Sequence, residues 1–170
     1  MTKNTATHCQ ETIGCDLGDK KSEICVLGAD GKVKDRTSVR TTRKAISELF
    51  TRPAAHVVIE VGTHSRWVSA VIRTLGHRVT VANPRRVKLI SANDNKTDRH
   101  DAELLARLGR VDEALLSPVV HRGTQVQADL TVARARDMLV STRTKLVNHV
   151  RGTVKAFGER LPTCSSASFC

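Results

Sequence analysis

Aromatic side chains are scarce in this sequence, which has three Phe, one Trp and no Tyr among 170 residues. Proteins that stack nucleic-acid bases need an aromatic platform, so we do not expect that mode of binding. Long hydrophobic runs are missing too, because the longest, from Ile24 to Leu27, is far shorter than the roughly 20 apolar residues of a membrane span. We therefore expect no membrane association, and the polar residues 1–12 predict no secretory signal.

The five cysteines form no CxxC pair and are odd in number. Zinc ribbons and disulfide scaffolds need paired cysteines, so the sequence disfavours both classes. Free cysteines suit a reducing compartment, and we expect a cytoplasmic protein. Positive charge is abundant by contrast, because 28 Lys and Arg stand against 17 Asp and Glu, a formal net charge of +11. This excess favours nucleic acid as the partner, and a basic soluble protein without such a partner is the alternative.

The alternation of apolar and polar residues, together with turn residues, predicts a sheet in the first half of the chain. Asp30-Gly31 is a strong hairpin signal, and the successive apolar residues 57–59 predict a strand covered on both faces. The expected elements are strands at 12–20, 22–29 and 32–39, a helix from 41 or 42 to 51, a strand at 56–61, a helix at 63–75 and a strand at 78–82. A meander followed by alternating helices and strands predicts an α/β fold of the ribonuclease-H-like type, a mixed sheet flanked by helices.

The second half of the sequence is predicted to be helical. A short segment at 85–90 and a clearer helix at 98–110 come first. Residues 124–157 contain almost no Gly or Pro, and Val132, Leu139 and Leu146 recur at a spacing of seven. This pattern predicts a long helical extension with at most one break. Its apolar stripe needs a partner, either the preceding domain or a second copy of the chain.

Four carboxylates are the candidate catalytic and metal-binding residues. Asp16 lies between two glycines on one face of a predicted strand, which leaves room for a metal ion and a phosphate. Glu60 ends the most buried strand, where open α/β sheets place their sites. Asp98 and Asp101 share one face at the start of a helix. Oxygen ligands of this kind suit Mg²⁺ or Mn²⁺, which can stabilise the attacking and leaving oxygens of a phosphodiester.

Each of these carboxylates also has a structural explanation. Asp16 fits a turn at the end of a strand, and Glu60 fits an ion pair with an arginine such as Arg66. Asp98 and Asp101 fit ordinary helix-start chemistry, in which acidic side chains complement the positive end of the helix. Their joint occurrence favours the metal site.

Five segments are informative together: residues 13–18 followed by Lys20-Lys21-Ser22, residues 57–60 leading to Gly62, Asn83-Pro84-Arg85-Arg86-Val87, Lys96-Thr97-Asp98-Arg99-His100-Asp101-Ala102, and the helical stretch 134–152. In this order they resemble the amino-terminal half of the DEDD insertion-sequence transposases, over roughly residues 12–160. The most specific pieces are the Asn-Pro-Arg segment and the last acid pair with its preceding Lys-Thr.

The resemblance implies a RuvC-like form of the ribonuclease-H-like fold, named after the Holliday-junction resolvase. It implies that Asp16, Glu60, Asp98 and Asp101 are the acids of the family name and bind divalent metal. It also implies DNA transposition or recombination guided by a bridge RNA, with dimerisation through the long helix. Family members are considerably longer and carry a second domain with a nucleophilic serine. We therefore expect this chain to lack that domain and to be weak or inactive alone.

The expected organisation is a flexible tail at 1–10, a RuvC-like DEDD domain at 11–116, a helical, coiled-coil-like region at 117–160 and a tail at 161–170. Basic residues are the candidate contacts to nucleic acid, because Lys and Arg near a metal site suit a phosphate backbone. A solvated charged surface is the alternative for each of them. The candidates are Arg43, Lys44, Arg85, Arg86, Lys88, Lys96, Arg99, Arg143, Lys145 and Arg151.

Two functions therefore compete. One is a metal-dependent, DNA-processing domain of a transposase, and the other is a truncated module that binds DNA or structured RNA without turnover. With so few aromatics, specificity would come from a guide RNA, a partner or the further domain. A remoter alternative is an actin-like sugar kinase or ATPase, suggested by Asp16-Leu17-Gly18, but that fold needs a second lobe.

Overall fold

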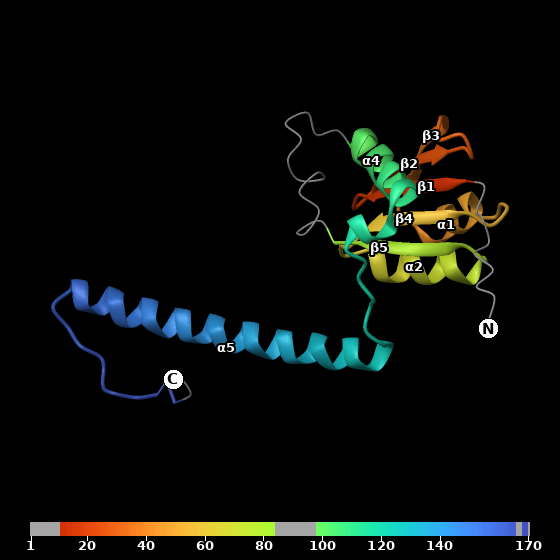
Figure 1. Cartoon of the computed structure of the whole chain (residues 1–170). Coiled ribbons are helices and arrows are strands. Elements are labelled where there is room, and N and C mark those ends of the chain that lie inside the picture. The colour runs from red at the N-terminus through yellow and green to blue at the C-terminus, as the bar shows by residue number, and fades with distance from the viewer. Residues whose placement is uncertain (1–10, 84–97, 166–167, 170) are drawn as a thin grey trace. The chain divides into compact units, whose positions relative to one another are not determined.

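The computed structural model describes residues 11–83, 98–165 and 168–169. It divides into two units, one that ends at His121 and one that begins at Arg122 (Figure 1). The first unit contains a five-stranded sheet. Its strands are β1 (Thr12–Leu17), β2 (Lys21–Leu27), β3 (Val33–Arg40), β4 (His56–Glu60) and β5 (Arg78–Ala82).

The strand order in the sheet is β3-β2-β1-β4-β5. The first three strands pair antiparallel as a meander, whereas β4 pairs parallel with β1 and β5 parallel with β4. This mixed sheet confirms the predicted α/β class and is consistent with a ribonuclease-H-like fold. The hairpin turn after β2 is also as predicted, because Gly31 has a φ of 78°, in the left-handed region that glycine tolerates.

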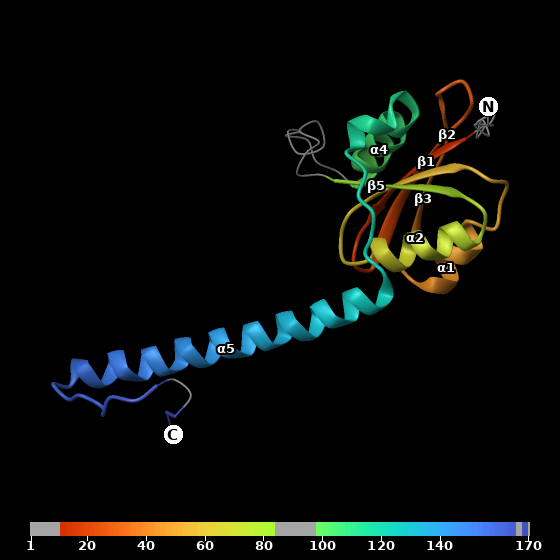
Figure 2. The same ribbon diagram turned by 60° about the horizontal axis from the view of Figure 1, so that its bottom comes forward.

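Helices cover both faces of the sheet (Figure 2). Helices α1 (Arg43–Leu49) and α2 (Ser65–Thr74) pack on one face, where Ile13, Val57 and Ile59 belong to the larger buried cluster. Helix α4 (Asp98–Val111), followed by the 3₁₀ helix η1 (Glu113–Leu116), packs on the other. Because side chains alternate along a strand, Gly14, Asp16 and Val58 belong to the α4 face.

Helix α4 lies unusually close to β1 because glycine and alanine line the contact. A Cβ atom built on Gly14 would lie 2.0 Å from the carbonyl oxygen of Ala102 and 2.5 Å from the amide nitrogen of Ala106. Gly109 makes a similar approach to Val58, because a Cβ atom built on Gly109 would lie 2.3 Å from Cγ2 of Val58. The missing side chains let the helix backbone rest on the strands. This contact places the first turn of α4 above the end of β1, where Asp16 lies.

A polar network with two buried members, His56 and Thr80, joins β4, β5 and η1. His56 Nε2 and Thr80 Oγ1 lie 2.8 Å apart, Thr80 donates its hydroxyl proton to Glu113, and Arg78 pairs with Glu113 at 2.9 Å. Since the single Thr80 proton goes to Glu113, His56 Nε2 is the donor to Thr80. Nδ1 accepts from Arg78 at 3.3 Å, which is the arrangement of a neutral ring. Burial, and then the charge of Arg78, lower the pKa of His56.

We expect this network to weaken below about pH 6.5, the ordinary pKa of histidine. The unfolded chain takes up a proton on His56 there while the folded chain resists it, so the free energy of unfolding falls as the pH falls. Urea denaturation at pH 7.5 and pH 5.5 measures this loss. It should be larger in the wild type than in His56→Gln, whose amide can still donate to Thr80. Equal losses in the two proteins would contradict the expectation.

The second unit is built on α5 (Thr124–Ala156), a helix of 33 residues without a break. The long helix predicted from the seven-residue spacing is thus confirmed, and within it Val147 is the one buried residue. The segment after the helix contacts it through Arg151, which donates to the carbonyl oxygen of Cys164 and lies over the ring of Phe169. Across the part of the chain that the structure describes, no helix has the length and apolarity to cross a bilayer.

Candidate metal and nucleic-acid site

Asp16 and Glu60 lie at the same end of neighbouring parallel strands. The register pairs Cys15 with Ile59, so the next residues, Asp16 and Glu60, follow side by side. Both belong to the face that α4 covers, because each lies two residues beyond a position that packs against that helix, Gly14 in β1 and Val58 in β4. Both residues are half-buried. The strand register therefore brings together two carboxylates that are 44 positions apart in the sequence.

Asp98 and Asp101 occupy the first turn of α4, as predicted. Asp98 is exposed, whereas Asp101 is half-buried. One carboxylate oxygen of Asp101, Oδ1, is inaccessible to solvent and has no hydrogen-bond partner among the described residues. Burial of a carboxylate oxygen without a partner costs free energy, because the water that it loses is not replaced. An atom in that state is suited to a ligand that is not part of the protein.

The electrostatic state of Asp16 shows that the four acids are neighbours. Its pKa is raised from 3.8 to about 6, first by burial and then by the negative charges of Asp98, Asp101, Glu60 and Glu23. Each of the other three predicted acids thus acts on Asp16. The acids are nevertheless not assembled as a coordination shell. Within residues 11–83 and 98–165, no three Asp, Glu, His or Cys side chains are arranged to hold a metal ion together. The metal-binding role of the four remains a prediction.

Glu23 is a fifth carboxylate beside this site that sequence reasoning missed. It lies directly across from Asp16 in the antiparallel pairing of β1 and β2. Its carboxylate is 3.7 Å from Nε of Arg99 in the first turn of α4. The sequence did contain a signal, because Asp16 and Glu23 are placed symmetrically about the Asp19-Lys20 turn. Counting the register across that turn would have put Glu23 on the same face.

The basic residues predicted to contact nucleic acid fall into four groups, of which the structure describes three. Arg99 lies beside the acids, but α1 carries Arg43 and Lys44 on the opposite face of the sheet. There Arg43 stacks over the ring of Trp67 at 5.5 Å, and Lys44 faces Glu48 at 3.9 Å. The sheet therefore separates these two from the acids. The other candidates lie on α5, in the second unit, or outside the described residues: Arg143, Lys145 and Arg151 in the former group and Arg85, Arg86, Lys88 and Lys96 in the latter.

The fold and the acid cluster agree with the class of protein that sequence comparison defines. A protein-family model described as a transposase matches residues 13–158, which is most of the chain. The chain belongs to that family, the DEDD transposases of the IS110 type. The resemblance seen in the sequence motifs is thereby confirmed.

Curated relatives support the same assignment. A probable family 20 transposase of Pseudomonas aeruginosa is 29 % identical over 86 % of this chain and 42 % of its own length. The transposase of insertion sequence element IS1111A from Coxiella burnetii is 26 % identical over 86 % of this chain and 39 % of its own. The transposase of insertion sequence element IS1328 from Yersinia enterocolitica is 30 % identical over 88 % of this chain and 44 % of its own length. The chain thus spans about two fifths of the length of these relatives.

Among solved structures, an inorganic polyphosphate/ATP-glucomannokinase from Arthrobacter is similar at 19 % identity, over 48 % of this chain and 47 % of the kinase. The TM-score of 0.33 is too low to equate the two folds.

Proposed function

We propose that this chain is the metal-dependent domain of a DNA transposase and takes part in phosphodiester cleavage or strand exchange. In this proposal the fold is of the RuvC-like form, and Asp16, Glu60, Asp98 and Asp101 hold Mg²⁺ or Mn²⁺. The observation that carries it is the buried Oδ1 of Asp101, which has no partner among the described residues and lies in a helix packed against the strand of Asp16. The donor set fits the ion, because hard cations prefer carboxylate oxygens.

In this proposal the four acids have different roles in holding the ion, which depend on how deeply each is buried. Asp16 and Glu60 come from strands in the middle of the sheet and therefore offer fixed oxygens. Asp98 is exposed at the start of α4, where it can contact a phosphate-bound ion as it arrives. A bound divalent ion would stabilise the negative charge that develops on a phosphodiester during its displacement.

Calorimetric titration with Mn²⁺ tests the metal site. We expect the wild-type chain to bind the ion and Asp101→Asn to bind it at least tenfold more weakly, because the amide removes one anionic oxygen. Asp137→Asn, on the exposed surface of α5, is the matched control with the same loss of charge. Equal affinity in Asp101→Asn and the control would refute the assignment of the site.

A binding module without turnover is the second candidate function. It is favoured by the observation that the acids of the described residues do not form a preassembled metal group. An assay with branched DNA in the presence of Mg²⁺ distinguishes the two candidate functions. Nicking or strand transfer by the wild type that is lost in Asp16→Asn supports the enzyme, whereas a wild type without any turnover, whose binding persists in Asp16→Asn, supports the module.

DNA is the proposed substrate, and a structured guide RNA the proposed source of its sequence specificity. The net charge of +11 supports nucleic-acid partners. The scarcity of aromatics leaves a guide RNA, a partner or a further domain as the source of specificity, and membership of the transposase family favours the guide RNA. Cys15, Cys25 and Cys164 are free thiols, which supports a reducing, cytoplasmic location.

Helix α5 is the proposed dimerisation element. Its apolar stripe is largely exposed, with Val132 at 70 %, Leu139 at 72 % and Leu146 at 61 % of full accessibility. The spacing of seven matches the seam of a coiled coil, so a second copy of the helix would bury these side chains. Each buried Leu is worth about 2 kcal/mol, which is enough for several such contacts to drive association.

We expect Leu139→Lys to weaken self-association at least tenfold, because it places a charge in the seam. Ser141→Lys adds the same charge on the opposite side of the helix and should have little effect. Sedimentation velocity over a range of protein concentrations measures both. Dimers that persist equally in the two variants would exclude the stripe as the interface.

A further inference from the structure

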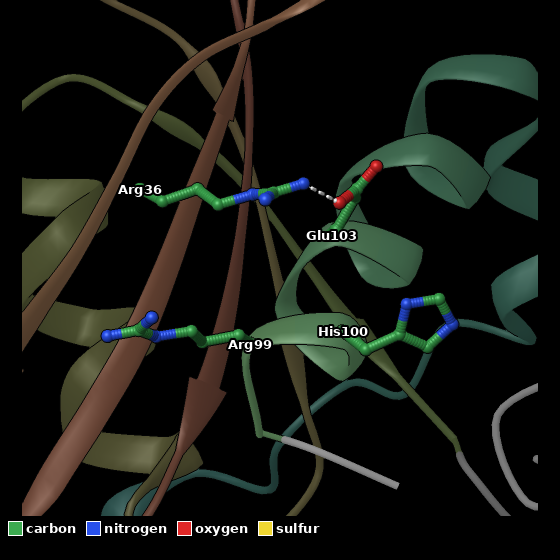
Figure 3. Close-up of a pocket in the computed structure, with 4 residues that line it drawn as sticks. All are labelled: Arg36, Arg99, His100 and Glu103. Atoms are coloured by element: carbon green, nitrogen blue, oxygen red, sulfur yellow. Dashed lines mark hydrogen bonds and ion pairs between the residues drawn. The ribbon is translucent and has the colours of Figure 1, made fainter. Parts of the chain in front are cut away.

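A small polar pocket lies between β3 and the first two turns of α4 (Figure 3). It has a volume of about 190 Å³ and is lined by Arg36, Arg99, His100 and Glu103. In the close-up, Arg36 reaches from β3 to Glu103 on the helix, and Arg99 extends towards the strands. All four lining side chains are polar, so the pocket does not suit an apolar ligand or a base. Its volume corresponds to about six water molecules, which is enough for a hydrated phosphate group.

The charges around this pocket leave a positive excess. Glu103 accepts a hydrogen bond from Arg36 and two from Arg107, through Nε at 2.8 Å and through a terminal nitrogen at 2.6 Å. One carboxylate therefore serves two guanidinium groups. Its side chain is 15 % exposed, whereas those of Arg36 and Arg107 are 52 % and 53 % exposed. Arg36, which lines the pocket, thus keeps donors that can face a ligand, because a guanidinium has five N–H groups, whereas Arg107 contributes its charge through Glu103.

Arg99 supplies the third cation and links the pocket to the acids. Its side chain is 77 % exposed, and its ion pair with Glu23 is long, at 3.7 Å between Nε and a carboxylate oxygen. Glu23 itself is largely buried, at 19 % exposure, so it is expected to keep this contact, and the remaining N–H groups of the exposed Arg99 are the ones that can meet a bound anion. Glu23 lies across from Asp16 in the sheet. An anion held by Arg99 would therefore sit next to the residues that the proposed function assigns to the metal.

We propose that this pocket binds one backbone phosphodiester of the nucleic-acid strand, with Arg36 and Arg99 as its contacts. The inference rests on the proposed function for the choice of ligand. A phosphodiester carries one negative charge, which matches the excess left by three arginines against Glu103 and Glu23. The planar donors of arginine suit two phosphate oxygens at once. A phosphate beside the metal position would fix the register of the strand and thus decide which bond reaches the acids.

Fluorescence anisotropy with a labelled four-way DNA junction tests the pocket, with a matched RNA junction as a second arm. EDTA is present throughout, so that the metal site does not contribute. We expect Arg36→Gln and Arg99→Gln each to weaken binding about five- to tenfold. The slope of log K against log salt should fall by about 0.9 in magnitude for each variant, as expected when one phosphate contact is lost.

Arg73→Gln is the matched control, because Arg73 is an exposed arginine of α2 on the other face of the sheet. It removes the same charge and should change neither the affinity by more than twofold nor the slope. Arg36→Lys keeps the positive charge but not the planar fork of donors and should recover part of the affinity. Weakened binding of either junction supports the pocket. The junction that is affected, DNA, RNA or both, shows which nucleic acid the pocket contacts. An effect equal to that of Arg73→Gln on both junctions overturns it.

The failure of this inference and that of the proposed function are distinguishable. Loss of Mn²⁺ binding in Asp101→Asn together with unchanged junction binding in Arg36→Gln would leave the metal site and remove the pocket. The converse result, obtained in EDTA, would leave a phosphate-binding pocket in a protein without the proposed metal site.

Discussion

Replacing Asp16 with asparagine is expected to stabilise the metal-free protein at pH 7.5 and to abolish its stabilisation by Mn²⁺. Burial and the neighbouring negative charges of Asp98, Asp101, Glu60 and Glu23 raise the pKa of Asp16 to about 6. Above that pH the folded chain carries an ionised carboxylate in a setting that disfavours it. A neutral amide of nearly the same shape removes this cost.

The sign of the effect follows from where the proton is held. Well below pH 3.8, its ordinary pKa, Asp16 is protonated in both the folded and the unfolded chain. As the pH rises from 4 to 6, the unfolded chain loses the proton first, so the free energy of unfolding falls across this window. At pH 7.5 the full cost is present. Allowing for solvent screening at this half-exposed side chain, we expect about 1 kcal/mol, or roughly 3 °C in melting temperature.

In saturating Mn²⁺ the order of stability should reverse, so that the wild type is more stable than Asp16→Asn. A ligand that binds the folded state at one hundred times its dissociation constant stabilises it by about 2.7 kcal/mol. The wild type should gain this amount from saturating Mn²⁺, whereas Asp16→Asn should gain little. Thermal unfolding with EDTA and with Mn²⁺ measures both effects, and Asp137→Asn again controls for the lost charge. An Asp16→Asn protein that melts below the wild type in EDTA would show that the carboxylate has a structural role.

Gly14→Ala is expected to destabilise the first unit by at least about 3 kcal/mol, although it adds a single methyl group. The new Cβ would lie 2.0 Å from the Ala102 carbonyl oxygen and 2.5 Å from the Ala106 amide nitrogen. Both are helix backbone atoms, which cannot turn aside as a flexible side chain would, so α4 must move away from β1. Overpacking of this kind in a buried contact typically costs 1–3 kcal/mol and can cost more.

Gly62→Ala is the matched control, because a Cβ at Gly62 would meet no atom within 4 Å. Its free energy of unfolding, from urea denaturation, should stay within about 0.5 kcal/mol of the wild type. Gly14→Ala should also lose affinity for Mn²⁺, since the shift of α4 would carry Asp101 away from Asp16. Wild-type stability in Gly14→Ala would mean that the close contact of helix and strand does not hold the two elements in register.

Much of the fold follows from local patterns along the chain. The turn at Asp30-Gly31 and a helix start at residue 41 or 42 were predictable because each depends on neighbouring residues. The structure shows that Thr42 is the cap, since its side chain accepts from the Ala45 amide. The long α5 was readable for the same reason, since its sequence has few helix breakers. The four acids could also be predicted as candidates from the sequence. The signals were the glycines beside Asp16, the strand end at Glu60 and the helix-start spacing of Asp98 and Asp101. The resemblance to a family joined them into one set.

The tertiary structure decided what those residues face. Gly14 could be taken as room for a ligand beside Asp16, but the space is filled by the backbone of α4, which sets how near Asp101 comes to the strand. Arg43 and Lys44 looked like contacts near the acids, yet α1 carries them to the other side of the sheet. Glu23 joined the acid cluster through pairing across a turn. Sequence alone specifies which residues carry charge and which segments are helix or strand, because those depend on side-chain chemistry and short-range spacing. Which charges meet depends on contacts between distant segments, and only the packed chain determines those.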